Sequence, residues 1–144
     1  MAASSTQDVV NWTSDQAKFA AGFESIFVGD SENTEDDLKR LFMPTYTQEV
    51  DGRVLSFPEF VDHIRHLRTA TTSVKVKVSQ FLRDGNQLAE RHTVSVEFSN
   101  KPRSEFEVFL FGVVHEDGRL SSVVETIRHA EGDAEDKDLG HAMS

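Results

Sequence analysis

Three segments of the sequence place ionisable side chains in rows that are otherwise apolar. Alternate residues of each segment are apolar, which is the pattern of a β-strand with one buried face. A charged group in such a row is informative because burying it without a partner is costly. The rows are Leu88, Glu90, His92, Val94, Val96 and Phe98 in the first segment, Glu105, Glu107, Phe109, Phe111 and Val113 in the second, and Val123, Glu125, Ile127 and His129 in the third.

Proton transfer is the chemistry that these side chains suit. If the three rows share one face of a sheet, His92, Glu107 and Glu125 approach one another inside an apolar cavity. Histidine titrates near neutral pH, and carboxyl groups in unlike surroundings differ in pKa, so one acts as a base and another as a donor. We predict that Glu125 or His92 is the base. Glu107 and Tyr46, the single tyrosine, would donate to a developing oxyanion. Isomerisation, dehydration or aldol-type closure next to a carbonyl group would then need no cofactor.

The same residues have other interpretations. Glu and His near strand ends are commonly exposed or paired with Arg and Lys, and Tyr46 also fits a core position with a satisfied hydroxyl. A non-catalytic binding module or dimeric scaffold would use the same pocket, with Glu90, His92 and Glu107 satisfying one another. A protein-transport adaptor would need an exposed apolar patch. The predicted pocket wall consists of Phe19, Phe23, Glu90, Phe109, Phe111 and Ile127.

Other common types of site are not indicated. His63 and His66 are three residues apart, but both lie off the apolar stripe of their predicted helix, so we expect a solvated helix face and no metal site. The sequence has no Gly-rich phosphate loop, nucleophile elbow or dinucleotide fingerprint. Its 144 residues include no cysteine, which excludes thiol chemistry and fits a reducing, cytoplasmic location.

Charge and hydropathy restrict the partners. The chain has 15 Lys and Arg against 25 Asp and Glu, a formal net charge of −10, and such a surface repels a phosphate backbone. Nucleic acid is therefore not expected. The longest apolar runs fall short of the about 20 residues that span a bilayer, so no membrane partner is expected either. A small apolar molecule remains the predicted ligand.

The elements that would position these residues are helices first and strands afterwards. Helical spacing predicts one helix over about 13–29 and a short second helix over about 31–44. A short strand at 45–50 leads to a third helix, whose start is marked by Ser56 with Glu59 three residues later. This is an α+β pattern, and short turns between the later strands make them antiparallel. Those strands are expected at 73–82, 88–98, 105–115 and 120–128.

The order of elements, together with several local phrases, resembles the nuclear transport factor 2-like superfamily, specifically its SnoaL-like branch. The resemblance covers roughly residues 13–132. It implies domain limits of 1–11 for a flexible N-terminus, 12–132 for the SnoaL-like domain and 133–144 for an acidic C-terminal tail. The phrases are Phe42 to Gln48, Val50-Asp51-Gly52, Phe57 to Leu67, Ala89 to His92, Glu107-Val108, and Asp117 to Leu120 leading to Glu125.

Such a resemblance implies a cone-shaped fold, in which three N-terminal helices pack on a curved, mostly antiparallel sheet that encloses a pocket. It also implies a homodimer formed through the outer face of the sheet. Characterised relatives include polyketide cyclases, ketosteroid isomerase and fungal isomerases of secondary metabolism, which act by acid–base catalysis without a cofactor. The sequence departs from the isomerase pattern at Arg128, where an acid often follows the glutamate of the last strand by three residues. The fold also hosts pure binding proteins.

Overall fold

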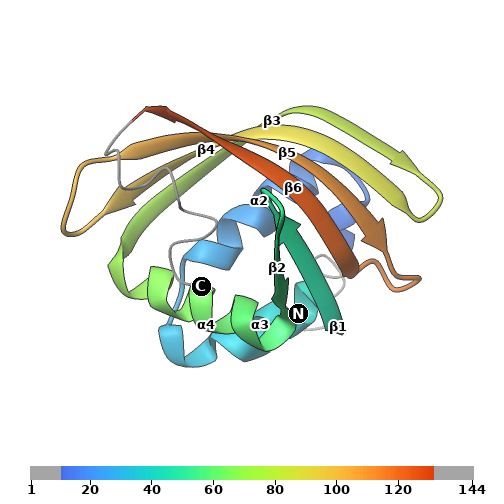
Figure 1. Cartoon of the computed structure of the whole chain (residues 1–144), viewed down its shortest axis with the longest axis horizontal. Coiled ribbons are helices and arrows are strands. Elements are labelled where there is room, and N and C mark those ends of the chain that lie inside the picture. The colour runs from blue at the N-terminus through green and yellow to red at the C-terminus, as the bar shows by residue number, and fades with distance from the viewer. Residues whose placement is uncertain (1–10, 132–144) are drawn as a thin grey trace.

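A computed structural model describes residues 11–131 as three α-helices packed against one six-stranded sheet. Figure 1 shows the sheet arching over the helices, with α2 beneath its concave face. The predicted α+β cone, with three helices on a curved and mostly antiparallel sheet, is confirmed. The elements are η1 (Asn11–Thr13), α2 (Gln16–Phe27), η2 (Ser31–Asn33), α3 (Thr34–Leu41), β1 (Phe42–Val50), β2 (Arg53–Ser56), α4 (Phe57–Ala70), β3 (Thr71–Asp84), β4 (Gln87–Phe98), β5 (Ser104–Val114) and β6 (Leu120–Glu131).

The strands follow the order β2-β1-β6-β5-β4-β3 across the sheet. Strands β3 to β6 form an antiparallel meander, as the short turns between them predict. Strand β1 pairs with β6 in parallel, and the short strand β2, which the sequence pattern did not predict, pairs with β1. Because β1 returns to the sheet beside β6, residues 46–50 lie next to residues 122–125 although the chain separates them widely.

The third predicted helix has the expected start. In α4 the Ser56 hydroxyl accepts a hydrogen bond from the Glu59 backbone N–H, and the Glu59 carboxylate accepts one from the Ser56 N–H. This capping box satisfies two helix-terminal donors. The second helix ends at Leu41, earlier than predicted, because the extended backbone of β1 already begins at Phe42.

Side chains of α2 attach the helix to β3, the edge strand of the sheet. The Glu24 carboxylate accepts a hydrogen bond of 2.8 Å from the Val76 backbone N–H, and the Gln16 amide donates to the Val78 carbonyl. At the other side of α2, Trp12 stacks on Phe19 with ring centroids 4.8 Å apart. These contacts fix the distance between α2 and the concave face of the sheet.

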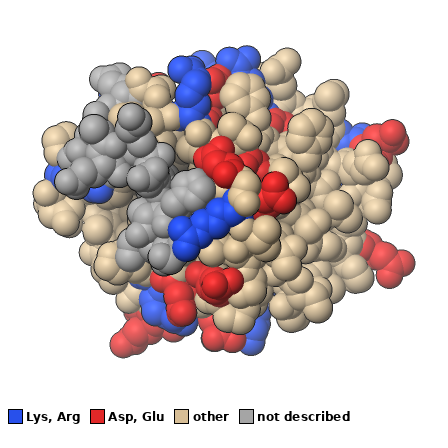
Figure 2. Space-filling view, in the orientation of Figure 1, with Lys and Arg blue, Asp and Glu red and all other residues tan. Residues whose placement is uncertain are grey.

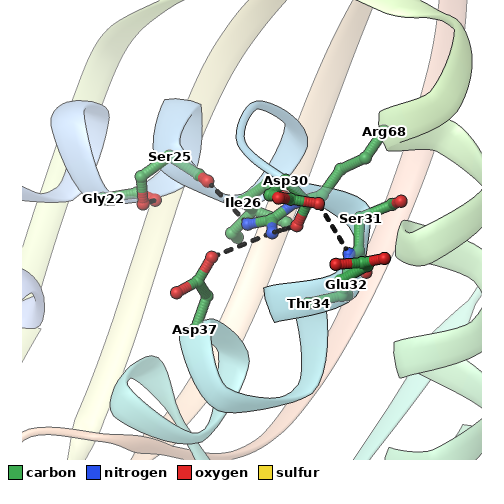
Figure 3. A network of polar contacts seen from close by, with 9 residues as sticks. All are labelled: Gly22, Ser25, Ile26, Asp30, Ser31, Glu32, Thr34, Asp37 and Arg68. Carbon is green, nitrogen blue, oxygen red and sulfur yellow. Dashed lines mark hydrogen bonds and ion pairs between the residues drawn. The ribbon is translucent and has the colours of Figure 1, made fainter.

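A buried arginine joins the three helices. The Arg68 guanidinium on α4 donates to the carbonyl groups of Ser25, Ile26 and Asp30 and to the Asp37 carboxylate, as Figure 3 shows. Four acceptors from α2, α3 and the segment between them thus surround one cation, which compensates its burial.

The described surface has no single charge sign. Figure 2 shows acidic and basic side chains interspersed on one face. No described helix is long and apolar enough to cross a membrane. The cytoplasmic location expected from the sequence stays a prediction. The predicted acidic tail and nearly all of the predicted flexible N-terminus lie outside the described residues.

Candidate functional site

A cavity lies between the helices and the concave face of the sheet. Its volume of about 60 Å³ is several times the roughly 10–15 Å³ that one water molecule requires. Aromatic and aliphatic side chains form most of the wall, and no Lys or Arg belongs to it. The lining residues are Trp12, Phe23, Ile26, Phe27, Phe42, Tyr46, Gln48, Phe60, His63, Ile64, Val94, Phe106, Val108, Leu110, Leu120, Val123, Glu125 and Ile127.

Glu125 is the acidic residue of this wall. It lies on β6 between Val50 of β1 and Leu110 of β5, in the row that faces the helices. Burial among apolar side chains raises the pKa of the Glu125 carboxyl to about 8, and the negative charges of Glu90 and Asp51 act in the same direction. At neutral pH most Glu125 carboxyls therefore carry a proton, and the site exchanges a proton near physiological pH.

Tyr46 and Gln48 line the same cavity from the neighbouring strand, where Gln48 pairs with Val123, two residues before Glu125. Both are buried on the inward row of β1, and the Tyr46 hydroxyl donates a hydrogen bond of 2.9 Å to Oε1 of Gln48. Burial, together with the charge of Glu125, raises the pKa of Tyr46 well above its ordinary value, so its hydroxyl keeps its proton. Gln48 was not predicted as a site residue. Its position two residues after Tyr46, on the same face of a strand, was the signal for it.

His63 faces the cavity from α4, which corrects the expectation of a solvated helix face. The residue is 5% exposed, and its Nδ1 has no hydrogen-bond partner among the described residues. Burial lowers the pKa of His63 to about 4, with His66 adding to the effect, so the imidazole is neutral at pH 7. His63 follows Phe60 by three residues and belongs to the buried face of α4, which is wider than the stripe of Phe57, Val61, Ile64 and Leu67 on which the prediction relied.

Glu90 and His92 form a buried pair on β4, at one side of the cavity. Glu90 Oε2 lies 2.7 Å from His92 Nδ1, and both side chains are fully inaccessible to solvent. Burial raises the pKa of Glu90, while the hydrogen bond to His92 opposes this change. The Phe23 ring lies over the His92 ring with 4.4 Å between centroids, so Phe23 forms the cavity wall where the sequence had placed His92.

Glu107 lies on the opposite face of the sheet, so the expected convergence of His92, Glu107 and Glu125 is wrong in this respect. His92 pairs across the strands with Val108, which places the row of Val108 inward and the row of Glu107 outward. The Glu107 carboxylate instead accepts hydrogen bonds from Arg91 and Arg128. These two bonds lower the pKa of Glu107. Arg128, which departs from the isomerase pattern, is therefore a partner of Glu107.

The other predicted pocket residues are divided between three environments. Phe23 and Ile127 line the cavity, whereas Phe19 packs in the core against Trp12. Phe109 and Phe111 belong to the outward row of β5 and are 42% and 68% exposed, so they do not line the cavity as predicted. No cluster of three potential metal ligands occurs within residues 11–131.

Comparison with known proteins places this geometry in a wider context. No family model matches the chain. The chain is 32% identical over 105 residues to the uncharacterized protein C11D3.04c of Schizosaccharomyces pombe, a match that covers 73% of this chain and 80% of the yeast protein. A similar solved structure is a nuclear transport factor 2-like protein of unknown function from Exiguobacterium, with a TM-score of 0.57, 17% identity and coverage of 73% of this chain and 93% of the other. The chain therefore belongs to one family with the yeast protein, and it shares the nuclear transport factor 2-like fold with the solved structure.

Two further solved structures illustrate what this superfamily fold contains. An epoxide hydrolase from M. tuberculosis described as LEH-like has a TM-score of 0.60 at 15% identity, over 92% of this chain and 88% of its own. IdmH, a putative polyketide cyclase from Streptomyces antibioticus, has a TM-score of 0.57 at 14% identity, over 77% and 90%. At these identities the nuclear transport factor 2-like fold is shared, and the activity must be argued from the cavity itself.

Proposed function

We propose that the protein binds a small, mostly apolar carbonyl compound in this cavity and catalyses a cofactor-independent acid–base reaction on it, as an isomerase or cyclase does. The observation that carries the proposal is Glu125, a carboxyl group with a pKa of about 8 in an apolar wall, beside the Tyr46–Gln48 pair. A general base works best when its pKa lies near the working pH. The absence of Lys and Arg from the lining favours an uncharged ligand.

The proposed reaction begins with proton transfer to Glu125. The ionised carboxylate removes a proton from the carbon next to the carbonyl group, and the bonding electrons move to the carbonyl oxygen as an enolate. Tyr46 keeps its hydroxyl proton, and its bond to Oε1 of Gln48 orients the amide so that its NH₂ group is a donor for that oxygen. In a substrate with a β,γ double bond, Glu125 then returns the proton to the γ-carbon of the dienolate, and the double bond moves next to the carbonyl group, which leaves the atoms of the substrate conserved.

Two predicted roles change in this proposal. His92 is separated from the cavity by Phe23, and Glu107 faces outward, so neither takes part in the proton transfer. His63 enters the site as a neutral imidazole on the wall formed by α4. Because its Nδ1 lacks a partner among the described residues, it is available to a polar group of the ligand.

An exchange experiment tests the proposal without knowledge of the natural substrate. The protein is incubated with cyclohexanone in D₂O, and the loss of the ketone α-protons is followed by proton NMR. The exchange should rise with pH with a midpoint near 8, and Glu125→Gln should reduce it by about 100-fold or more. Glu97→Gln, which changes an exposed carboxyl outside the cavity, is the matched control and should leave the exchange rate unchanged.

The rival function is ligand binding without catalysis. Chemical-shift changes at Tyr46 and Glu125 on addition of the ketone, with exchange no faster than in buffer, would favour this rival. The same buried polar groups would then orient a ligand but not react with it. Exchange that is unaffected by Glu125→Gln would remove the proposed base from the mechanism.

A homodimer through the outer face of the sheet is part of the proposal. The exposed apolar residues Phe109, Phe111 and Val113 on β5 adjoin Val124 on β6. A groove of about 430 Å³ runs across these strands, between residues of β3, β4, β5 and β6. Contiguous apolar surface of this kind is typical of protein contacts. The Glu107 carboxylate with Arg91 and Arg128 borders the patch and would supply its polar edge.

A further inference from the structure

Glu90 and His92 retain hydrogen-bonding capacity that no described residue uses. Their mutual contact occupies Glu90 Oε2 and His92 Nδ1. Glu90 Oε1 and His92 Nε2 are buried and have no partner within residues 11–131. Leaving a buried polar atom without a partner costs free energy, so two such atoms on one hydrogen-bonded pair give this place the capacity to bind a further polar group.

The pair is next to the cavity, and a side chain that lines the cavity contacts it. His92 pairs with Val108 across the strands, and Glu90 pairs with Leu110; both partners line the cavity. Phe23, which lines the cavity from α2, lies with its ring 4.4 Å from the His92 ring. Phe23 packs between Phe19 and Phe27 of the same helix at the margin of the core, and it is itself partly exposed. Rotation of this ring would join the polar pair to the cavity.

We propose that Phe23 covers a second polar subsite, in which Glu90 Oε1 and His92 Nε2 bind a hydroxyl group of the ligand. This inference rests on the proposed function, because it places the carbonyl end of the same ligand at Glu125. The ligand is then an apolar compound with a carbonyl group at one end and a hydroxyl group at the other.

A hydroxyl group fits the two free atoms in every protonation state of the pair. When the imidazole is neutral with its proton on Nδ1, both free atoms are acceptors, and the hydroxyl donates to one of them. When Nε2 carries a proton, the hydroxyl accepts from it and donates to Glu90 Oε1. A carbonyl or ether oxygen lacks the donor, and a carboxylate would bring a second negative charge next to Glu90.

The sheet sets the distance between the two ends of the ligand. Glu90, Leu110 and Glu125 are direct cross-strand neighbours on β4, β5 and β6. Two strand spacings separate Glu90 from Glu125, which is about 10 Å between backbones. Their side chains point into the concave face and so approach each other more closely than the backbones do. A ligand that contacts both groups therefore has a short hydrocarbon connection between its polar ends.

The test uses straight-chain methyl ketones of four, five and six carbons, each with and without a terminal hydroxyl. Dissociation constants are measured by NMR titration, with the ¹⁵N signals of the His92 imidazole as the readout of the subsite. In the wild-type protein the hydroxyl should lower the dissociation constant about five- to tenfold at the best chain length. It should also shift the His92 Nε2 signal, which the plain ketone leaves in place.

Variants separate the subsite from the rest of the cavity. His92→Phe keeps a ring against Phe23 and should abolish the gain from the hydroxyl, whereas His129→Phe, which changes the imidazole packed on Phe106, should retain it. Phe23→Ala uncovers the pair and should increase the gain. If His92→Phe does not fold, the wild-type imidazole signals and Phe23→Ala still decide the matter.

The results also distinguish failure of the subsite from failure of the carbonyl site. Equal affinities for hydroxylated and plain ketones, in both the wild type and Phe23→Ala, would overturn the subsite and leave the carbonyl site standing. If no ketone binds, the carbonyl site fails. Straight-chain alcohols of the same lengths then test the subsite alone in Phe23→Ala: a shift of the His92 Nε2 signal supports it, and an unchanged signal overturns it.

Discussion

Replacement of Glu125 by Gln should make the protein more stable, and the gain should grow with pH. The pKa of the Glu125 carboxyl is about 8 in the folded protein against 4.5 ordinarily. Between these values the folded state binds a proton that the unfolded state has lost, so stability falls as pH rises from about 4.5 to 8. The pKa difference of about 3.5, at about 1.4 kcal/mol for each pH unit, sets an upper limit near 5 kcal/mol on the loss of stability. Water that enters the cavity makes this loss smaller.

Urea denaturation at intervals from pH 4 to 9 measures this effect. The free energy of unfolding of Glu125→Gln minus that of the wild type should be nearly constant below pH 4.5 and should rise by about 2 to 5 kcal/mol by pH 8. Glu97→Gln, which removes an exposed carboxyl, should reproduce the pH dependence of the wild type. A difference that is flat between pH 5 and 8 would show that Glu125 ionises as an ordinary glutamate, and the proposed base would lose its physical support.

Three other substitutions test the packing and assembly. Gly22→Ala should destabilise the fold by about 1–3 kcal/mol in thermal unfolding, because the new Cβ would lie 2.6 Å from Cε3 of Trp12. This clash should outweigh the higher helix propensity of Ala, and an unchanged melting temperature would contradict it. Arg68→Met removes four hydrogen bonds at the helix junction and should cost about 3 kcal/mol in urea denaturation, so a loss below about 1 kcal/mol would refute the assigned role. Phe111→Lys should convert a dimer into a monomer in sedimentation velocity, whereas a wild-type protein that is already monomeric would exclude the proposed interface.

The helices and strands were predictable because each has a local signal. Ser56 and Glu59 mark the start of α4, and alternation marks β3 to β6. Strand β2 was missed because its four residues are too short for a period to emerge. The parallel pairing of β1 with β6 was also beyond local signals, since it depends on where the chain returns after the whole meander.

For the candidate site, the sequence did not determine which face of each strand points inward. Alternation divides β5 into the rows of Glu107 and of Val108, and both contain bulky apolar side chains. The choice between them depends on the register with β4, in which His92 meets Val108, and the loop between the strands does not reveal that register. Glu125 and Tyr46 were placed correctly in the cavity wall because their rows are apolar on one side alone. Phe109 and Phe111, apolar as they are, face outward because they pair with Arg91 and Ala89 in the outward row of β4.

His63 and Glu125 together should give the protein a stability maximum between acid and alkaline pH. The lowered pKa of His63, about 4 against 6.5, means that the unfolded state takes up a proton below pH 6.5 that the folded state does not. Stability therefore falls as pH decreases from 6.5 to 4, by at most about 3.5 kcal/mol from this residue. Glu125 acts in the opposite direction above pH 4.5, so the two contributions largely cancel between about pH 4.5 and 6.5, and stability falls above pH 6.5 because of Glu125.

Separate variants should reveal each contribution. His63→Leu should make the free energy of unfolding fall with rising pH already from about pH 4.5 in urea denaturation, while His66→Leu, on the exposed face of the same helix, should keep most of the wild-type plateau between about pH 4.5 and 6.5. Loss of the plateau in His66→Leu but not in His63→Leu would mean that the imidazole in the cavity is not the group that resists protonation. His63 in the wall opposite the sheet would then be charged at neutral pH. The inference that the cavity takes uncharged ligands would no longer hold.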